Sequence, residues 1–164
     1  MIKQLNILIL TMFGIGNSKY APGTAASFIT CVIYIFVYSY QVNIIFLILI
    51  LVLIFIYSVY SIDVSKKYFS ETDAKEIVID EFIGQSIPIL TIYTFIEKNN
   101  LSDFILLTFV SFILFRVFDI WKPYPINKID LNMKNGFGVI LDDIVAGIYT
   151  IVILLTIIFF INNV

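Results

Sequence analysis

Long apolar runs separated by short polar links dominate the sequence. Five such runs can be recognised, covering residues 25–40, 44–62, 77–96, 104–118 and 139–161. An α-helix needs roughly 20 mostly apolar residues to cross a membrane, with a range of about 17–25. The second and fifth runs meet this length easily, whereas the first and fourth are slightly short. The pattern therefore predicts a bundle of membrane helices.

The third run, residues 77–96, is apolar but is interrupted by two acids, a glycine, a glutamine and a proline. Such groups are tolerated at membrane depth only where protein or water shelters them. We therefore expect this segment either to span with its polar groups facing the bundle interior or to be re-entrant. Residues 1–13 are also apolar and predict a short helix lying at the interface, with a signal peptide as the alternative.

The longest link, residues 119–138, carries two prolines and two glycines. These residues interrupt helices and favour turns, so we expect a structured loop here rather than a helix. The whole pattern predicts an all-α fold in one domain, residues 1–164. It would be a polytopic membrane helical bundle of about four to five spanning or re-entrant helices, with a short N-terminal interfacial helix.

The composition indicates that lipid is the main solvent of the chain, and it excludes several catalytic mechanisms. The chain is 60% hydrophobic and 13% charged, against roughly 45–50% and 25% for soluble domains. It has no basic block, so no nucleic-acid partner is expected. It has no histidine, which excludes Ser-His and Cys-His catalysis within the chain, and its one cysteine, Cys31, is expected to pack in an apolar run. Carboxylates, lysine, arginine or a bound metal must carry any reaction.

The charged residues fall mostly on one side of the predicted bundle. If all five runs cross, nine of the ten basic residues lie on the side that precedes the first run, and only Lys98 lies on the other. An excess of Lys and Arg marks cytoplasmic loops, so this side is predicted to be cytoplasmic. Ten of the twelve acids share it, the exceptions being Glu97 and Asp103. The polar blocks should therefore meet at one membrane face, although a re-entrant third run would reverse the later assignments.

The block GIGNSKYAPGT, residues 14–24, precedes the first run. Pro22 and Gly23 favour a turn, and Thr24 suits the N-cap of the following helix. The free N–H groups of that helix start would point at the cytoplasmic face, where they suit an anion such as phosphate. A plain helix start after a glycine loop is the alternative.

Two apolar segments carry neighbouring acids: IVIDEFIG, residues 77–84, and VILDDIVAG, residues 139–147. In each, an acid pair follows three aliphatic residues and a small residue follows one turn later. Two helices meeting through small residues would bring both pairs to one site. With a helix start near Asp73, Asp80 and Glu81 would lie ~10 Å along the helix, beyond the reach of its dipole. A charge at membrane depth is costly unless it is paired or hydrated, so a functional role is favoured.

The block FRVFDIWKPYPINKID, residues 115–130, places Arg116 three residues before Asp119 and Lys122 three residues after it. The two cations could hold phosphate oxygens. Interfacial anchoring by the aromatic residues of the block, and a plain salt bridge for the aspartate, are the alternatives.

Five carboxylates crowded at one membrane face would repel each other, and a hard divalent cation relieves that repulsion. Mg²⁺ prefers oxygen ligands, can bind a phosphate and can lower the pKa of an attacking water. The predicted catalytic carboxylates are Asp80, Glu81, Asp119, Asp142 and Asp143. The predicted metal ligands are Asp80, Glu81, Asp142 and Asp143. The predicted substrate-binding residues are Gly23, Thr24, Arg116 and Lys122.

The blocks GIGNSKYAPGT, EIVIDEFIGQ, FRVFDIWKPYPINKID and GFGVILDDIVAG resemble, in this order, the signature blocks of the phosphatidylglycerophosphatase A family. The resemblance implies an all-helical, Mg²⁺-dependent lipid phosphatase of the bacterial inner (cytoplasmic) membrane, with its active site facing the cytoplasm. It also implies a phospholipid substrate, phosphatidylglycerophosphate, whose terminal phosphate is removed to give phosphatidylglycerol.

Two other functions fit parts of the pattern. Intramembrane carboxylates also mark ion paths, so an ion-coupled membrane transporter is the main alternative. A non-catalytic membrane scaffold is the other, and it would leave the acids unexplained. Three points are open within the phosphatase hypothesis. They are which carboxylate activates water, whether water attacks directly or a phospho-enzyme forms, and the oligomeric state.

Overall fold

The structure is a computed structural model that describes residues 2–65, 69, 74–96 and 100–162. The described residues form seven α-helices and one short 3-10 helix, with no strand. In chain order the elements are α1 (Ile2–Leu10), η1 (Ile15–Asn17), α2 (Pro22–Ser39), α3 (Ile44–Ser65), α4 (Ile79–Phe95), α5 (Leu101–Trp121), α6 (Ile126–Asn132) and α7 (Gly136–Asn162).

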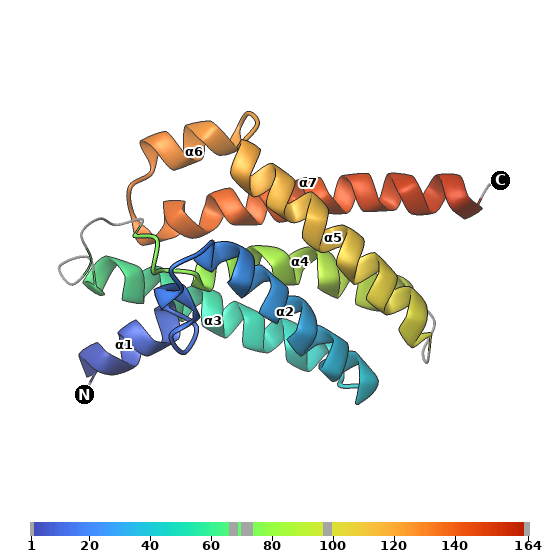
Figure 1. Ribbon diagram of the computed structural model, residues 1–164, viewed down its shortest axis with the longest axis horizontal. Helices are drawn as coiled ribbons and strands as arrows, with labels where there is room; N and C mark the ends of the chain where they lie inside the picture. Colours follow the sequence, from blue (N-terminus) through green and yellow to red (C-terminus); the bar gives the residue numbers. More distant parts are fainter. Residues whose placement is uncertain (1, 66–68, 70–73, 97–99, 163–164) are drawn as a thin grey trace.

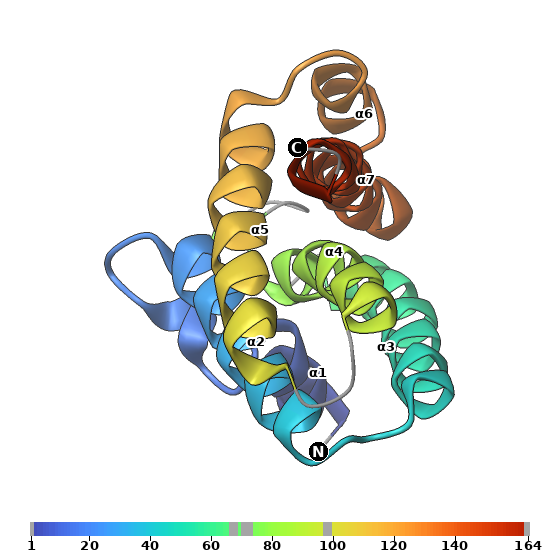
Figure 2. The ribbon, with the colours of Figure 1, turned by 90° about the vertical axis from the view of Figure 1, so that its right-hand side faces the viewer.

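Five long helices run back and forth along the molecule, with α4 at the centre in contact with α2, α3, α5 and α7 (Figures 1 and 2). Helices α2, α4 and α7 run in one direction, and α3 and α5 run in the other (Figure 1). The N-terminal ends of α2, α4 and α7 and the C-terminal end of α5 therefore lie at the same end of the bundle. Helix α6 joins α5 to α7 at this end, which we call the polar end.

Within the described part of the chain, four helices are long and apolar enough to cross a membrane: Pro22–Ser39, Ile44–Ser65, Leu101–Trp121 and Gly136–Phe159. Many of their outward side chains are apolar, such as Leu53 and Leu106, which are 66% and 61% exposed. The prediction of an all-α membrane bundle is therefore confirmed. Helix α4 has 17 residues and a length of about 25 Å, and its full crossing stays a prediction.

Helices α4 and α7 cross at close range because each helix has a glycine at the crossing. A Cβ added at Gly84 would lie 2.7 Å from the backbone oxygen of Asp143, and one added at Gly147 would lie 2.6 Å from the backbone oxygen of Gly84. The expectation that two acid-bearing helices meet through small residues agrees with this crossing.

Two predicted helix starts are wrong. Helix α2 begins at Pro22 with Ala21 as its N-cap, so Thr24 lies inside the first turn and does not cap it. Proline is suited to the first helical position because its missing N–H has no partner there in any case. Helix α4 begins at Ile79 rather than near Asp73, which lies outside the described residues. The N–H of Val78 instead donates to the carbonyl oxygen of Leu10 at 3.0 Å, which holds residues 74–78 against the N-terminal segment.

The prediction of a loop over residues 119–138 is also wrong. Helix α5 continues to Trp121, α6 lies within the link, and α7 already begins at Gly136. Ile126, the first residue of α6, is fully buried, so packing against the rest of the bundle stabilises this short helix. A residue outside α7 provides a hydrogen-bond acceptor for the first N–H group of this helix. The N–H of Gly136 donates to Asp63 Oδ1 at 2.9 Å.

Helix α1 agrees with the predicted short N-terminal helix, and its interfacial position stays a prediction. The hydroxyl of Tyr57 donates to Asn6 Oδ1 at 2.7 Å, which ties α1 to α3. Cys31 is buried in α2, as expected, and is not in a disulfide.

Candidate active site

A cavity of about 470 Å³ opens at the polar end of the bundle, between α2, α4, α5 and α7 and the segment of residues 74–78. All nine predicted site residues line it, although they come from four separate parts of the chain: Gly23, Thr24, Asp80, Glu81, Arg116, Asp119, Lys122, Asp142 and Asp143. The predicted meeting of the polar blocks at one end is therefore confirmed. The individual roles of these residues stay predictions.

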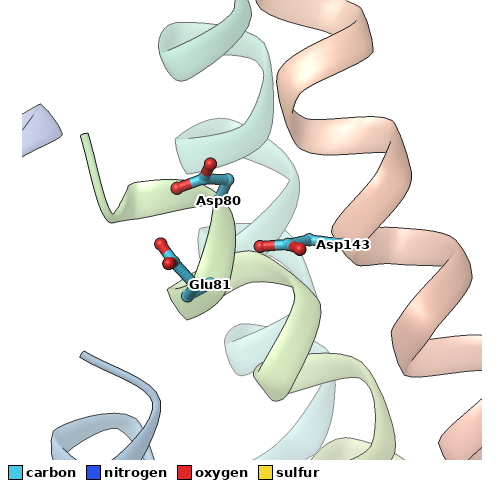
Figure 3. A group of neighbouring side chains, drawn as sticks. All are labelled: Asp80, Glu81 and Asp143. Atoms are coloured by element: carbon cyan, nitrogen blue, oxygen red, sulfur yellow. The ribbon is translucent and has the colours of Figure 1, made fainter. Parts of the chain in front are cut away.

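Three of the carboxylates that line the cavity lie close together, as Figure 3 shows. Asp80 and Glu81 come from α4 and Asp143 comes from α7, and one oxygen atom of each lies within 4.8 Å of the others. Asp80 and Asp143 are buried, with 7% and 3% of their surfaces exposed. Glu81 Oε2 is also buried and has no hydrogen-bond partner among the described residues. We call these three residues the acid cluster.

The helix dipole acts differently on the two sides of the acid cluster. Because α4 begins at Ile79, Asp80 and Glu81 lie in its first turn, where the free N–H groups favour negative charge. The prediction that they lie beyond the reach of the dipole is therefore wrong. Asp143 lies seven residues after the start of α7, about 10 Å along the helix, and receives little of this stabilisation.

Arg116 is a cation that lies beside the acid cluster. Its Nη1 forms a salt bridge with Asp119 Oδ2 one turn later on α5 and lies 3.9 Å from Glu81 Oε1. Gly23 at the start of α2 permits this arrangement, because a Cβ there would collide with Glu81 Oε1 and lie 3.3 Å from Arg116 Nη1. The N-terminal turn of α2 thus lies directly against the carboxylate and the guanidinium.

Lys122 approaches the cavity from the end of α5. It has a left-handed backbone (φ 45°, ψ 58°), which residues other than glycine adopt uncommonly. Its Nζ donates to Asp142 Oδ2 at 2.8 Å and lies 3.3 Å from Asp130 Oδ1. Burial alone lowers the pKa of Lys122, but the hydrogen bond to Asp142 and the two nearby carboxylates outweigh burial and raise the pKa above its ordinary value.

The two acids of α7 therefore have different surroundings. Asp143 belongs to the acid cluster, whereas Asp142 is paired with Lys122. The role of Asp142 as a metal ligand stays a prediction.

Sequence reasoning missed two polar residues here. Lys75 lines the cavity from the segment before α4, and Asp130 contacts Lys122 from α6. Asp130 stands eight residues after Lys122 in the same block, but the pairing depends on a helix that the sequence pattern did not predict.

A bundle of membrane helices with a carboxylate-rich cavity at one end defines a polytopic membrane protein with an enzyme-like site. Comparisons with known proteins give the family. The model of the family described as Phosphatidylglycerophosphatase A matches residues 8–158. The chain belongs to the phosphatidylglycerophosphatase A family and is a phosphatase enzyme, as its motifs predicted.

Three relatives are similar to the chain, and two of them carry the name of this family. A Bacteroides thetaiotaomicron protein, named as a candidate phosphatidylinositol-3-phosphatase, is 32% identical over 92% of this chain and 91% of its own length. Phosphatidylglycerophosphatase A of Escherichia coli is 31% identical over 86% of this chain and 76% of its own length. The Haemophilus influenzae protein of the same name is 38% identical over 52% of this chain and 47% of its own length. No solved structure matches the chain.

Proposed function

We propose that this enzyme removes the terminal phosphate of phosphatidylglycerophosphate, giving phosphatidylglycerol and phosphate, in a Mg²⁺-dependent reaction at the cytoplasmic face of the bacterial inner membrane. Family membership and the names of the Escherichia coli and Haemophilus influenzae relatives support the substrate. The observation that carries the proposal is the acid cluster, which shares one cavity with Arg116 and Lys122 at the end of a membrane bundle.

The acid cluster fits a divalent cation. Three carboxylate oxygens lie within 4.8 Å of one another, and the buried Glu81 Oε2 has no hydrogen-bond partner among the described residues. Mg²⁺ is commonly held by a few carboxylates together with water and substrate phosphate oxygens. Asp80, Glu81 and Asp143 would hold it here, with Asp142 as the further predicted ligand. When bound, the ion supplies positive charge to the phosphate and acidifies water.

The other cavity residues would bind the phosphate group. Arg116 and Lys122 can neutralise its oxygens, and the free N–H groups of Gly23 and Thr24 at the start of α2 suit the same anion. Asp119 holds Arg116 by its salt bridge. These interactions orient the phosphorus for attack from one side and stabilise the charge that develops on its oxygens.

One of the five cavity carboxylates would accept the proton of the attacking water. A carboxylate could instead attack the phosphorus directly, forming a phospho-enzyme. The stereochemistry at phosphorus separates the two routes when the substrate carries a chiral, isotopically labelled thiophosphate in place of the phosphate. Direct water attack inverts the configuration at phosphorus, whereas a phospho-enzyme route inverts it twice and therefore retains it.

Charge and aromatic residues support the proposed orientation. Four basic side chains lie at the polar end on or beside α5, α6 and α7: Arg116, Lys122, Lys128 and Lys134. Basic residues favour the cytoplasmic side. Aromatic side chains settle at headgroup level, and three of them are strongly exposed at this end: Tyr20, Trp121 and Tyr124. The cavity mouth would thus lie where a lipid headgroup reaches it.

The transporter alternative receives less support. Among the described residues, α2, α3, α4 and α7 carry no charged side chain in the halves that lead away from the cavity. Ion paths across membranes are commonly marked by ionisable side chains along their length.

A second substrate is suggested by the Bacteroides relative, whose name specifies phosphatidylinositol 3-phosphate. Both lipids present a phosphate monoester, so the same cavity chemistry serves either one. Phosphate release by the purified full-length protein from each lipid, in matched detergent micelles, decides between them. We expect the larger kcat/KM with phosphatidylglycerophosphate; a larger value with phosphatidylinositol 3-phosphate would reject the proposed substrate.

A further inference from the structure

Lys122 is held by two carboxylates from different helices. Its Nζ lies 2.8 Å from Asp142 Oδ2 on α7 and 3.3 Å from Asp130 Oδ1 on α6. Asp142 lines the cavity, whereas Asp130 is not among the residues that line it. One of the two acids therefore belongs to the cavity lining, and the other holds the amine from outside that lining.

The helix that carries Asp130 is fixed to the bundle. Ile126 at the start of α6 is fully buried, and the hydroxyl of Tyr149 on α7 donates to the carbonyl oxygen of Tyr124 at 2.8 Å, just before α6. Asp130 also lies 3.6 Å from Lys134, so it bridges two lysines. A carboxylate on such an element can define the position of a flexible side chain.

Lysine has a long, flexible side chain, and ordering it at a phosphate costs conformational entropy. The ammonium group of Lys122 has three N–H donors, so it can donate to a phosphate oxygen while carboxylates hold it in place. A second carboxylate outside the cavity lining restricts the side chain before the phosphate arrives and so lowers this entropic cost.

We propose that Asp130 is a positioning residue that retains Lys122 at the cavity, where Lys122 binds a phosphate oxygen of the substrate. This inference rests on the proposed function, because it assigns phosphate binding to Lys122. Asp130 itself does not touch the substrate. Its effect should therefore fall on substrate binding, which the ground state and the transition state share.

The test compares Asp130→Asn, Asp130→Glu and Lys134→Gln in the full-length protein, with phosphatidylglycerophosphate in detergent micelles. We expect Asp130→Asn to raise KM by roughly three- to tenfold while kcat changes by less than about twofold. Asp130→Glu keeps the carboxylate and should restore KM. Lys134→Gln removes the other partner of Asp130 and is the matched control for general effects on α6, so its KM should equal that of the wild type.

An unchanged or lower KM in folded Asp130→Asn protein would overturn the inference, because Asp130 would then be a bystander or a competitor of phosphate. An equal rise in Lys134→Gln would also overturn it. Reductive methylation of Lys122, measured by mass spectrometry against the exposed Lys128, gives a readout without substrate. It should be faster in Asp130→Asn than in the wild type, and an equal rate would contradict the contact. If the wild type releases no phosphate from phosphatidylglycerophosphate, the proposed function is contradicted. The contact between Asp130 and Lys122 is then still tested by the methylation rate, which does not depend on the substrate.

Discussion

The glycine crossing between α4 and α7 should control the geometry of the acid cluster. In Gly84→Ala, the new Cβ would lie 2.7 Å from the backbone oxygen of Asp143, whereas ordinary contacts begin at 3.4 Å. The helices must therefore move apart locally by about 0.7 Å, the difference between these two distances. This shift acts directly on Asp143, which α7 contributes to the cluster. Misplacement of reacting groups by 1 Å can cost roughly a hundredfold in rate, so we expect kcat to fall at least about tenfold.

The effect on stability should be smaller than the effect on activity. Replacing glycine by alanine inside a helix favours folding by about 1 kcal/mol, and overpacking costs about 1–3 kcal/mol. The two effects oppose each other, so the net loss should lie between zero and about 2 kcal/mol. Thermal unfolding in detergent micelles measures this loss of stability. Phosphate release at varied Mg²⁺ concentrations measures the effect on the activity of the acid cluster. We expect a higher Mg²⁺ concentration for half-maximal activity.

Val152→Ala is the control, because Val152 lies on α7, the helix that carries Asp143, and is 57% exposed, away from the crossing. It should retain the wild-type kcat and Mg²⁺ dependence. Wild-type kcat and Mg²⁺ dependence in folded Gly84→Ala protein would refute the reasoning, since the acid cluster would then tolerate the separation.

Three further predictions concern the cavity and its orientation. Gly23→Ala should lower kcat with little loss of stability, because the new Cβ would displace the Glu81 side chain from its place beside α2. Steady-state kinetics and thermal unfolding on one preparation check this, and an unaltered kcat would contradict it. Lys122→Gln should raise KM by roughly tenfold or more, since it removes a charge-assisted contact to phosphate, and an unchanged KM would remove this residue from the binding set. Cysteine labelling should report the orientation, because the single native cysteine is buried. A membrane-impermeant maleimide should label Asn43→Cys in intact spheroplasts and Asn127→Cys only after permeabilisation, and the opposite pattern would reverse the proposed topology.

The helices and the location of the site could be predicted because both follow from local patterns. Apolar runs of sufficient length specify membrane helices whatever their neighbours are. The acid pairs stand out because charge is costly in such runs, and the small residues one turn later indicated a close crossing. Gly84 and Gly147 do lie at that crossing.

The helix boundaries could not be predicted because contacts distant in sequence set them. The start of α4 depends on the hydrogen bond from Val78 to the carbonyl oxygen of Leu10, and the start of α7 depends on Asp63. Helix α6 is short and forms where Ile126 can be buried, which no local pattern specifies. The pairing of Lys122 with Asp130 follows from α6 and was missed with it.

The central claim is that Asp80, Glu81 and Asp143 hold the divalent cation on which phosphate release depends. The most direct measurement is phosphate release from phosphatidylglycerophosphate by the purified wild type and by folded Asp143→Asn protein, each with Mg²⁺ and with a chelator in its place. We expect release only from the wild type with Mg²⁺. Release by the wild type in the chelator, or a wild-type rate from Asp143→Asn, would contradict the claim.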